Sequence, residues 1–253
     1  MAIGMRDLIR RWVLPFVDPR RLLSVLRIPG FFLEWRAYRA RAIGETVRLV
    51  DTYPCVADRT LHTPFDPHYF YQGAWLARRV AAFRPSLHVD IGSSILTMSV
   101  LSSQVHTVVA DYRPLRATVS GLIPLGADVT RLPFADASLA SVSSLHVVEH
   151  VGLGRYGDPL DPDGTRNAAR ELARIVKPGG RLYLSVPVGR ERVCFNAHRV
   201  LAPRSVAAMF APLALDRFSL VDDDGRFNEN ASLEGAARLE YGCGMFEFVK
   251  PGV

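Results

Sequence analysis

The chain has 253 residues, enough for one α/β domain and an appendage, and its 49% hydrophobic and 22% charged residues are typical of a soluble globular protein. No apolar stretch reaches the roughly 18 residues of a membrane-spanning helix. A signal peptide is not expected either, because arginines and a proline interrupt the first apolar run, Leu8 to Val17, and no cleavage site follows it. The three cysteines are widely spaced and form no CxxC pair, which argues against a disulfide framework or a zinc site. We therefore expect a cytoplasmic protein without a bound metal.

The net charge of +6 is concentrated near the N-terminus. Residues 1–41 contain nine arginines and three acidic residues, which accounts for the whole excess, and the rest of the chain is balanced. A nucleic-acid-binding domain usually carries a basic face together with aromatic residues or a recognition helix that read the bases. The sequence has neither, so we expect no nucleic-acid partner.

A basic helical arm with its linker, residues 1–60, precedes the main domain, residues 61–253. Helices are predicted from Arg6 to Leu14, from Arg20 to Arg27 and from Phe31 to about Val50, and the prolines between them are expected to break the helix. Apolar residues at helical spacing among the arginines suit peripheral contact with an anionic membrane, at its inner face. The alternative is that this apolar face packs on the domain or on a second subunit.

Strand and helix signals alternate through the main domain. In chain order they predict a helix from about Tyr69 to Phe83, strands at Leu87 to Ile91, His106 to Ala110 and Ala140 to Leu145, a helix at Thr165 to Val176 and a strand at Arg181 to Val186. This order predicts a parallel sheet with helices on both faces. The last two predicted strands, Leu215 to Val221 and Met245 to Val249, have no comparable helix between them and suit an antiparallel edge pair.

Polar residues follow the predicted strands, which is where ligands bind in a doubly wound sheet. They are Asp90-Ile91-Gly92-Ser93-Ser94, Asp111-Tyr112, Asp128-Val129 and His146 to His150. Carboxylates in these places can accept hydrogen bonds from the ribose hydroxyls and the adenine amine of a nucleoside. Asp111 lies about 20 residues after the glycine turn, the usual place of a ribose-binding acid.

Between about Leu87 and Val188 the chain carries, in order, the motifs Val89-Asp90-Ile91-Gly92, Asp111, Gly126-Ala127-Asp128, Leu132 to Ser138, Val147-Val148-Glu149-His150 and Val176-Lys177-Pro178-Gly179-Gly180. In the order and spacing of these motifs the chain resembles the class I S-adenosylmethionine-dependent methyltransferases. A second set of segments comprises Glu149 to Asp161, Ser185 to Glu191, Phe195 to Arg199 and Phe218 to Asp223. In these segments the chain resembles, more narrowly, the uncharacterised methyltransferase-like family DUF268.

The resemblance implies a Rossmann-like α/β fold with a seven-stranded, mostly parallel sheet and an antiparallel edge strand, and S-adenosylmethionine as the cofactor. The implied cofactor-binding residues are Asp90, Gly92, Ser93, Ser94, Asp111, Tyr112, Asp128, Val129 and His146. The glycine motif departs from the superfamily pattern Asp-x-Gly-x-Gly-x-Gly, because Ser94 and Leu96 stand at the second and third glycine positions. Leu96 is expected to push the following helix outward, with weaker or altered cofactor binding.

Histidines and a polar loop supply the candidates for acceptor chemistry. His150 and His198 are candidate general bases, because imidazole is available in its neutral form near pH 7. The candidates for acceptor binding are Arg155, Tyr156, Asp158 and Asn196, since a long polar loop at this edge commonly carries function. His146 and His150 are four residues apart, but no third ligand with supporting spacing is evident, so no metal site is expected.

These features predict an O-methyltransferase that acts on a hydroxyl of a glycan or small-molecule precursor. Two other hypotheses for the function stay open. Asp111 would serve the ribose of NAD equally well, which is compatible with an NAD-dependent oxidoreductase. The altered glycine motif is compatible with a non-catalytic binding or scaffold protein that keeps the fold.

Overall fold

The computed structural model describes residues 19–252, which divide into two compact units between Phe65 and Asp66. This division falls close to the domain boundary expected after residue 60. Within the described residues, no helix combines the length and the apolar character needed to cross a bilayer.

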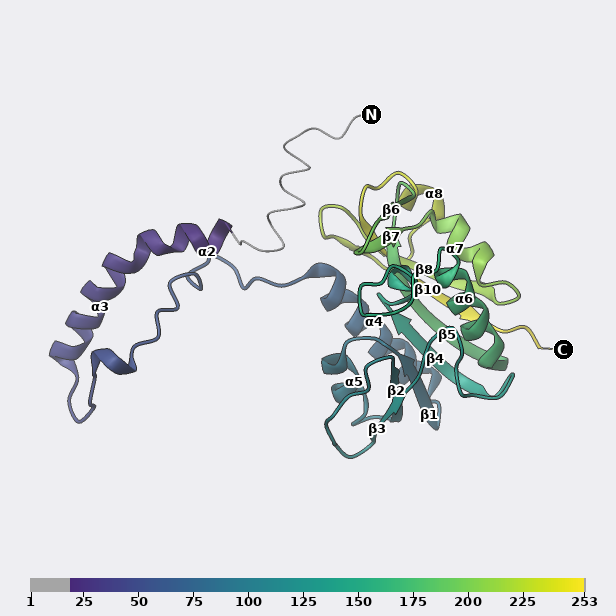
Figure 1. Cartoon of the computed structure of the whole chain (residues 1–253), viewed down its shortest axis with the longest axis horizontal. Coiled ribbons are helices and arrows are strands. Elements are labelled where there is room, and N and C mark those ends of the chain that lie inside the picture. The colour runs from purple at the N-terminus through teal and green to yellow at the C-terminus, as the bar shows by residue number, and fades with distance from the viewer. Residues whose placement is uncertain (1–18, 253) are drawn as a thin grey trace. The chain divides into compact units, whose positions relative to one another are not determined.

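The first unit is mainly helical (Figure 1). Its elements are α2 (Pro19–Ser24), η1 (Val25–Arg27), α3 (Ile28–Arg41) and η2 (Leu49–Asp51). The prediction that Pro29 separates two helices is wrong, because this proline lies in the first turn of α3, where no amide hydrogen is needed. The predicted helix from Arg6 to Leu14 lies outside the described residues.

The third predicted helix of the arm also ends earlier than expected. α3 stops at Arg41 rather than near Val50, since Ala42 is extended and the chain then turns. Gly44 has a φ of 80° in this turn, a left-handed conformation that interrupts any helix.

An eight-stranded sheet forms the centre of the second unit, in the order β3-β2-β1-β4-β5-β10-β8-β9 (Figure 1). The strands are β1 (Leu87–Ile91), β2 (His106–Asp111), β3 (Leu122–Gly126), β4 (Leu139–Leu145), β5 (Val176–Val188), β8 (Ala214–Val221), β9 (Phe227–Asn228) and β10 (Gly242–Val249). β1 to β5 pair in parallel, and β10 lies antiparallel between β5 and β8. The mostly parallel sheet with an antiparallel edge is confirmed. The sheet has eight strands rather than seven because the two-residue β9 pairs with β8 beyond the expected edge.

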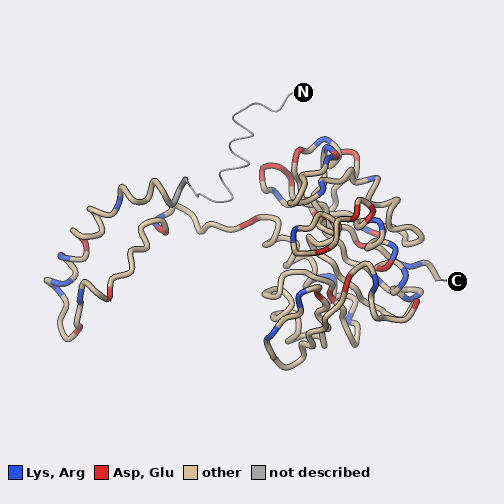
Figure 2. Tube along the Cα trace, viewed as in Figure 1, with Lys and Arg blue, Asp and Glu red and all other residues tan. Residues whose placement is uncertain are grey.

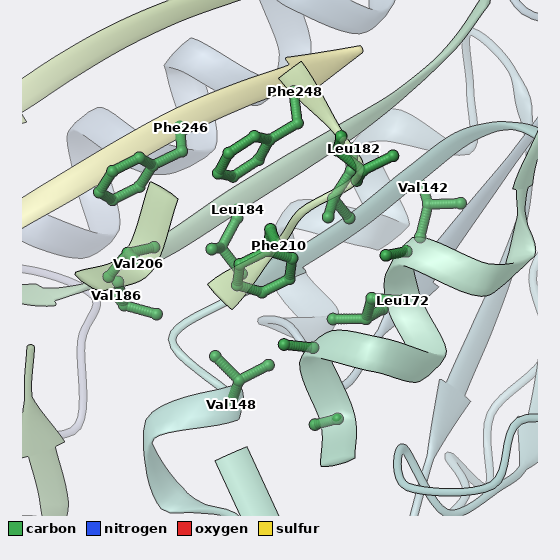
Figure 3. Packing of buried hydrophobic residues seen from close by; sticks show 14 of the residues in the cluster. Val142, Val148, Leu172, Leu182, Leu184, Val186, Val206, Phe210, Phe246 and Phe248 are labelled. Carbon is green, nitrogen blue, oxygen red and sulfur yellow. The ribbon is translucent and has the colours of Figure 1, made fainter. Parts of the chain in front are cut away.

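Helices cover both faces of this sheet. They are α4 (Pro67–Phe83), α5 (Ile95–Leu101), η3 (Val148–His150), α6 (Gly164–Ile175), α7 (Pro203–Met209) and α8 (Leu233–Ala236). Side chains alternate along a strand, so Leu182 and Leu184 of β5 pack in one buried cluster with α6 and α7, whereas Tyr183 packs in another with α4 and α5. Figure 3 shows the first cluster, with Leu172 of α6 and Val206 of α7 among its members. The sheet is therefore buried on both faces, and its strand ends form a fixed edge.

The start of α4 is capped by Asp66. Its carboxylate accepts hydrogen bonds from the amides of His68, at 2.9 Å, and Tyr69, at 3.2 Å, and Pro67 occupies the first helical position. The rings of both capped residues stack on His146, which follows β4. The cap thus holds the first turn of α4 against the carboxyl edge of the sheet.

A hairpin-like pair, β6 (Arg192–Cys194) and β7 (His198–Val200), follows β5 and forms a separate two-stranded sheet. Its turn carries Ala197, whose carbonyl oxygen lies 2.5 Å from His150 Nδ1.

Acidic and basic residues are interspersed over the second unit (Figure 2), in keeping with its balanced charge.

Candidate cofactor and acceptor site

The candidate site lies at the carboxyl ends of β1, β2 and β4. β1 stands between β2 and β4, so the strand order reverses here, and doubly wound folds form their ligand crevice at such a point. A pocket of about 190 Å³ occupies this position. Nine of the predicted site residues line it: Gly92, Asp111, Tyr112, Asp128, Val129, His146, His150, Tyr156 and Asp158.

Gly92 forms the tight turn between β1 and α5. Its φ is +71°, a conformation that favours glycine, and its amide donates to the Ala110 carbonyl of β2 at 2.8 Å. A Cβ atom here would lie 3.0 Å from Val147 Cγ1 and 3.6 Å from Asp111 Oδ2. The turn therefore requires glycine both for its backbone and for the open space beside it.

Asp90 supports this turn from below rather than lining the pocket. It is fully buried and accepts from the Ser93 amide at 3.0 Å, the Ser93 hydroxyl at 2.6 Å and the Ser143 hydroxyl of β4. Burial raises the pKa of Asp90 to about 6, against the opposing effect of these hydrogen bonds. Ser94 is the N-cap residue that precedes α5, and it also lies outside the pocket lining. Direct cofactor contacts were predicted for Asp90, Ser93 and Ser94; none of the three lines the pocket, and Asp90 and Ser93 are hydrogen-bonded to each other within the turn.

His88 extends the buried polar network beneath the turn. Its Nε2 lies 2.9 Å from Ser143 Oγ and its Nδ1 2.8 Å from Ser141 Oγ. Because the Ser143 hydroxyl donates to Asp90, it must accept from His88 Nε2–H. Burial lowers the pKa of His88 to about 4, so the ring is neutral at pH 7 and its Nδ1 accepts from the Ser141 hydroxyl.

This burial of a neutral imidazole predicts that His88 makes folding stability depend on pH. The unfolded chain, with a histidine pKa near 6.5, binds more protons than the folded chain between about pH 6.5 and 4, so stability falls as the pH falls. The contribution lost at pH 5 is about 2 kcal/mol. Urea unfolding at pH 7 and pH 5 should show a smaller loss for His88→Gln than for the native chain. The raised pKa of Asp90 acts in the opposite sense in both proteins, so the comparison removes it; equal losses would contradict the assignment.

Two carboxylates reach the pocket from neighbouring strand ends. Asp111 ends β2, and its Oδ1 accepts from the amide of Arg113 at 2.6 Å. Asp128 follows β3, and its Oδ1 accepts from the amide and the hydroxyl of Thr130, each at 2.8 Å. These hydrogen bonds hold each side chain at the pocket wall through one carboxylate oxygen.

The leucine at the third glycine position leaves the pocket open. Leu96 is 75% exposed, while α5 packs on the sheet through Met98 and Leu101. The prediction that Leu96 would push α5 outward is wrong, because its side chain points to solvent and does not lie between the helix and the sheet.

A buried imidazole–carboxylate pair follows β4. His146 Nδ1 lies 2.9 Å from Glu149 Oε1, and the two side chains are 6% and 0% exposed. His146 Nε2 and Glu149 Oε2 are also buried and have no hydrogen-bond partner among residues 19–252. Burial alone would lower the pKa of His146, but the Cys243 thiol and the Glu149 carboxylate outweigh it and raise that pKa to about 10.

Of the two candidate bases, His150 lines the pocket and His198 does not. His150 Nδ1 lies 2.5 Å from the Ala197 carbonyl, which can only accept, and 3.3 Å from Arg155 Nη1, which can only donate; the shorter contact assigns a hydrogen to Nδ1. Burial lowers the pKa of His150, so its Nε2 is free of a proton at neutral pH. The His198 ring lies 6.4 Å from that of His150 and 5.1 Å from that of Tyr241, and burial lowers its pKa to about 4. The structure thus places His150, but not His198, where a base could meet a ligand.

The polar loop after η3 contributes two of its predicted residues to the pocket. Tyr156 and Asp158 line it, and Asp158 also organises the loop by accepting from the Gly152 amide at 2.8 Å. Arg155 is exposed, and its guanidinium lies 5.1 Å from the Tyr156 ring. Asn196 lies in the exposed β6–β7 turn with a φ of 61°, outside the pocket lining.

Some residues of the site were not predicted. Arg113 lines the pocket and stacks over the Tyr156 ring at 4.3 Å, and its position two residues after Asp111 was an available signal. His68 and Tyr241 stack on each other beside His146, but they come from the ends of elements far apart in the chain, and no local pattern marks them.

Solved structures with similar architecture include methyltransferases. The N-methyltransferase NodS from Bradyrhizobium japonicum, in complex with S-adenosylhomocysteine, is 16% identical over 74% of this chain and 89% of its own, with a TM-score of 0.53. The 1,6-didemethyltoxoflavin-N1-methyltransferase from Burkholderia thailandensis is 14% identical over 94% of this chain and 92% of its own, with a TM-score of 0.52. This chain therefore has the fold of the class I S-adenosylmethionine-dependent methyltransferases.

A family model gives the narrower match. The family described as "Caenorhabditis protein of unknown function, DUF268" matches residues 118–228, which confirms the second resemblance. No curated protein matches the chain by sequence.

Proposed function

We propose that this protein is an S-adenosylmethionine-dependent methyltransferase. The observation that carries the proposal is the open pocket at the strand-order reversal, where Gly92, Asp111 and Asp128 meet. A glycine turn beside two carboxylates from successive strand ends suits an adenosyl group, since one acid can accept from the ribose and the other from the adenine side.

The residues present fit this cofactor. A Cβ at Gly92 would fill the space next to Asp111 Oδ2, so the turn keeps room for a ligand beside the carboxylate. Asp111 would hold the ribose, Asp128 and Val129 the adenine, and Gly92 the methionine end. When bound, S-adenosylmethionine supplies a methyl group on a positively charged sulfur, a good leaving group that needs little covalent help.

His150 is the residue that we propose as the general base for a hydroxyl acceptor. The Ala197 carbonyl fixes its tautomer, so that Nε2 can take a proton. The Glu149 carboxylate, 3.6 Å from Nε2, would stabilise the imidazolium that forms. This arrangement supports O-methylation, with the rate coming mainly from the alignment of the acceptor.

For the acceptor, we propose a glycan or a small hydroxylated precursor. Tyr156, Asp158 and Arg113 give the pocket one wall that offers both hydrogen-bonding groups and an aromatic face, which suits a polyhydroxylated ligand.

Leu22, Leu23 and Leu26 of the first unit are all more than half exposed near Arg27, which supports the prediction of peripheral membrane contact at the inner face.

Calorimetric titration of the full chain with S-adenosylmethionine, S-adenosylhomocysteine and NAD tests the proposed function. We expect the first two ligands to bind and NAD to give no heat of binding. Binding of NAD alone would instead favour an oxidoreductase that uses Asp111 for the NAD ribose. Absence of binding by all three would favour a scaffold protein that has kept only the fold.

A further inference from the structure

A second cluster of chemically reactive side chains lies beside the proposed cofactor pocket. It joins His68 in the first turn of α4, His146 after β4 and Cys243 in β10. A ring nitrogen of each histidine and the cysteine sulfur all lie within 4.8 Å of one another. Three residues separated by 78 and 97 positions in the chain are thus brought to one point by the packing of α4 on the sheet.

The histidine at the centre of this cluster has an unsatisfied nitrogen. His146 Nδ1 is bonded to Glu149, whereas Nε2 is buried and, across the described part of the chain, has no hydrogen-bond partner. Leaving a buried polar atom unpaired is unfavourable, because the atom has lost its hydrogen bonds to water. A bound ligand at Nε2 would remove this cost.

The second bond of His146 is the one that metal-binding histidines make. A histidine that ligates a metal through one nitrogen usually donates the other N–H to a carboxylate, which fixes the ring and raises its basicity. Here Glu149 is that carboxylate, at 2.9 Å and fully buried. His146 is therefore already oriented as a metal ligand by its surroundings.

The remaining two ligands are held in place as well. The His68 ring stacks between His146, at 5.6 Å, and Tyr241, at 5.3 Å, and its backbone amide is fixed by Asp66. Cys243 is fully buried in β10, paired with Pro187 of β5 and Val221 of β8. Two imidazoles and a thiolate form a set of ligands that zinc-class ions prefer, with Zn–N near 2.0 Å and Zn–S near 2.3 Å.

We propose that His68, His146 Nε2 and Cys243 Sγ bind one divalent zinc-class metal ion, with Glu149 as the carboxylate that orients His146. The ion would tie the first turn of α4 to the carboxyl edge of the sheet and hold His146, which lines the cofactor pocket, in its left-handed conformation. A fourth position would stay open to water or to an acceptor group. This site does not depend on the proposed methyl transfer, because the binding of the ion can be measured alone.

Titration of the chelator-treated, reduced full chain with Co²⁺, on protein without a polyhistidine tag, tests the proposal. We expect one equivalent of Co²⁺ to bind with a thiolate-to-cobalt charge-transfer band in the near ultraviolet, and one equivalent of Zn²⁺ to abolish that band. A native chain that shows no such band at one equivalent would overturn the proposal.

Variants identify the ligands. Cys243→Ser should remove the charge-transfer band, and His68→Ala should weaken Co²⁺ binding at least tenfold while circular dichroism shows an intact fold. Glu149→Gln should lower the affinity about 10- to 100-fold while keeping the band, as expected for a carboxylate that acts through a ligand. Cys194→Ser is the matched control, since this thiol lies in β6 outside the cluster and its loss should change nothing. Survival of the band in Cys243→Ser, or its loss in Cys194→Ser, would show that the cluster is not the site.

Discussion

Asp111→Ala should bind S-adenosylmethionine and S-adenosylhomocysteine about 10- to 100-fold more weakly than the native chain. The carboxylate lies at the carboxyl end of β2, and Gly92 keeps the space beside its Oδ2 open. A hydrogen bond to a charged group contributes about 1.5–3 kcal/mol, and 1.4 kcal/mol corresponds to a factor of ten in affinity. Both ligands share the adenosine group, so both should lose the same factor. Isothermal titration calorimetry measures this directly.

The control for this substitution removes a negative charge elsewhere in the same unit. Asp224 lies in the turn between β8 and β9, where it pairs with Arg226 on the surface and does not line the pocket. Asp224→Ala should leave both affinities unchanged. If it weakened binding as much as Asp111→Ala does, the effect would be one of net charge rather than of a ribose contact.

The parallel part of the sheet was predictable because its strands are short apolar runs that end in polar residues. β1 was predicted over its full extent, and β2 and β4 to within one residue. β3 was not predicted, because Pro124 lies inside it and proline is unusual in a strand. Proline is tolerated here because β3 is an edge strand. β9 has two residues and no periodicity to detect.

The cofactor side of the site was predictable for the same reason. Parallel strands end at one edge of a sheet, so residues after β1, β2 and β4 had to converge there. That Asp90 is buried below the turn instead of lining the pocket was not predictable from the sequence. It depends on Ser143 of β4, which lies across from Asp90 and donates a hydrogen bond to it. The cluster of His68, His146 and Cys243 depends on how α4 and β10 pack, and no spacing along the chain encodes that.

Some residues at the glycine turn hold its conformation from within the sheet, and another faces the pocket. Asp90 and Ser93 hold the turn from inside the sheet, and His88 supports Asp90 through Ser143. Gly92 faces the pocket and presents only backbone. The turn is held by these hydrogen bonds in a chain that has Ser94 and Leu96 at the second and third glycine positions.

The position of Gly92 predicts that Gly92→Ala will strongly weaken cofactor binding in a chain that still folds. The substitution places an L-residue at a φ of +71°, which costs about 1–2 kcal/mol, and its methyl group would lie in the space beside Val147 and Asp111. We expect affinity for S-adenosylhomocysteine to fall at least about 100-fold, since backbone approach to the ligand is what glycine provides here. Calorimetry and urea unfolding together separate the two effects.

Gly179→Ala is the matched control, because Gly179 has nearly the same backbone conformation, with a φ of +73°, and a Cβ there would meet nothing within 4 Å. It lies in β5 near the register shift of the pairing with β4, where its amide donates to the Lys250 carbonyl, outside the pocket lining. Both variants should lose about 1–2 kcal/mol of stability from the left-handed conformation, and Gly92→Ala should lose somewhat more, because its Cβ would lie 3.0 Å from Val147 Cγ1. Only Gly92→Ala should lose the ligand, because only there does the added methyl group enter the pocket. Native affinity in Gly92→Ala would mean that the adenosyl group does not bind against this turn.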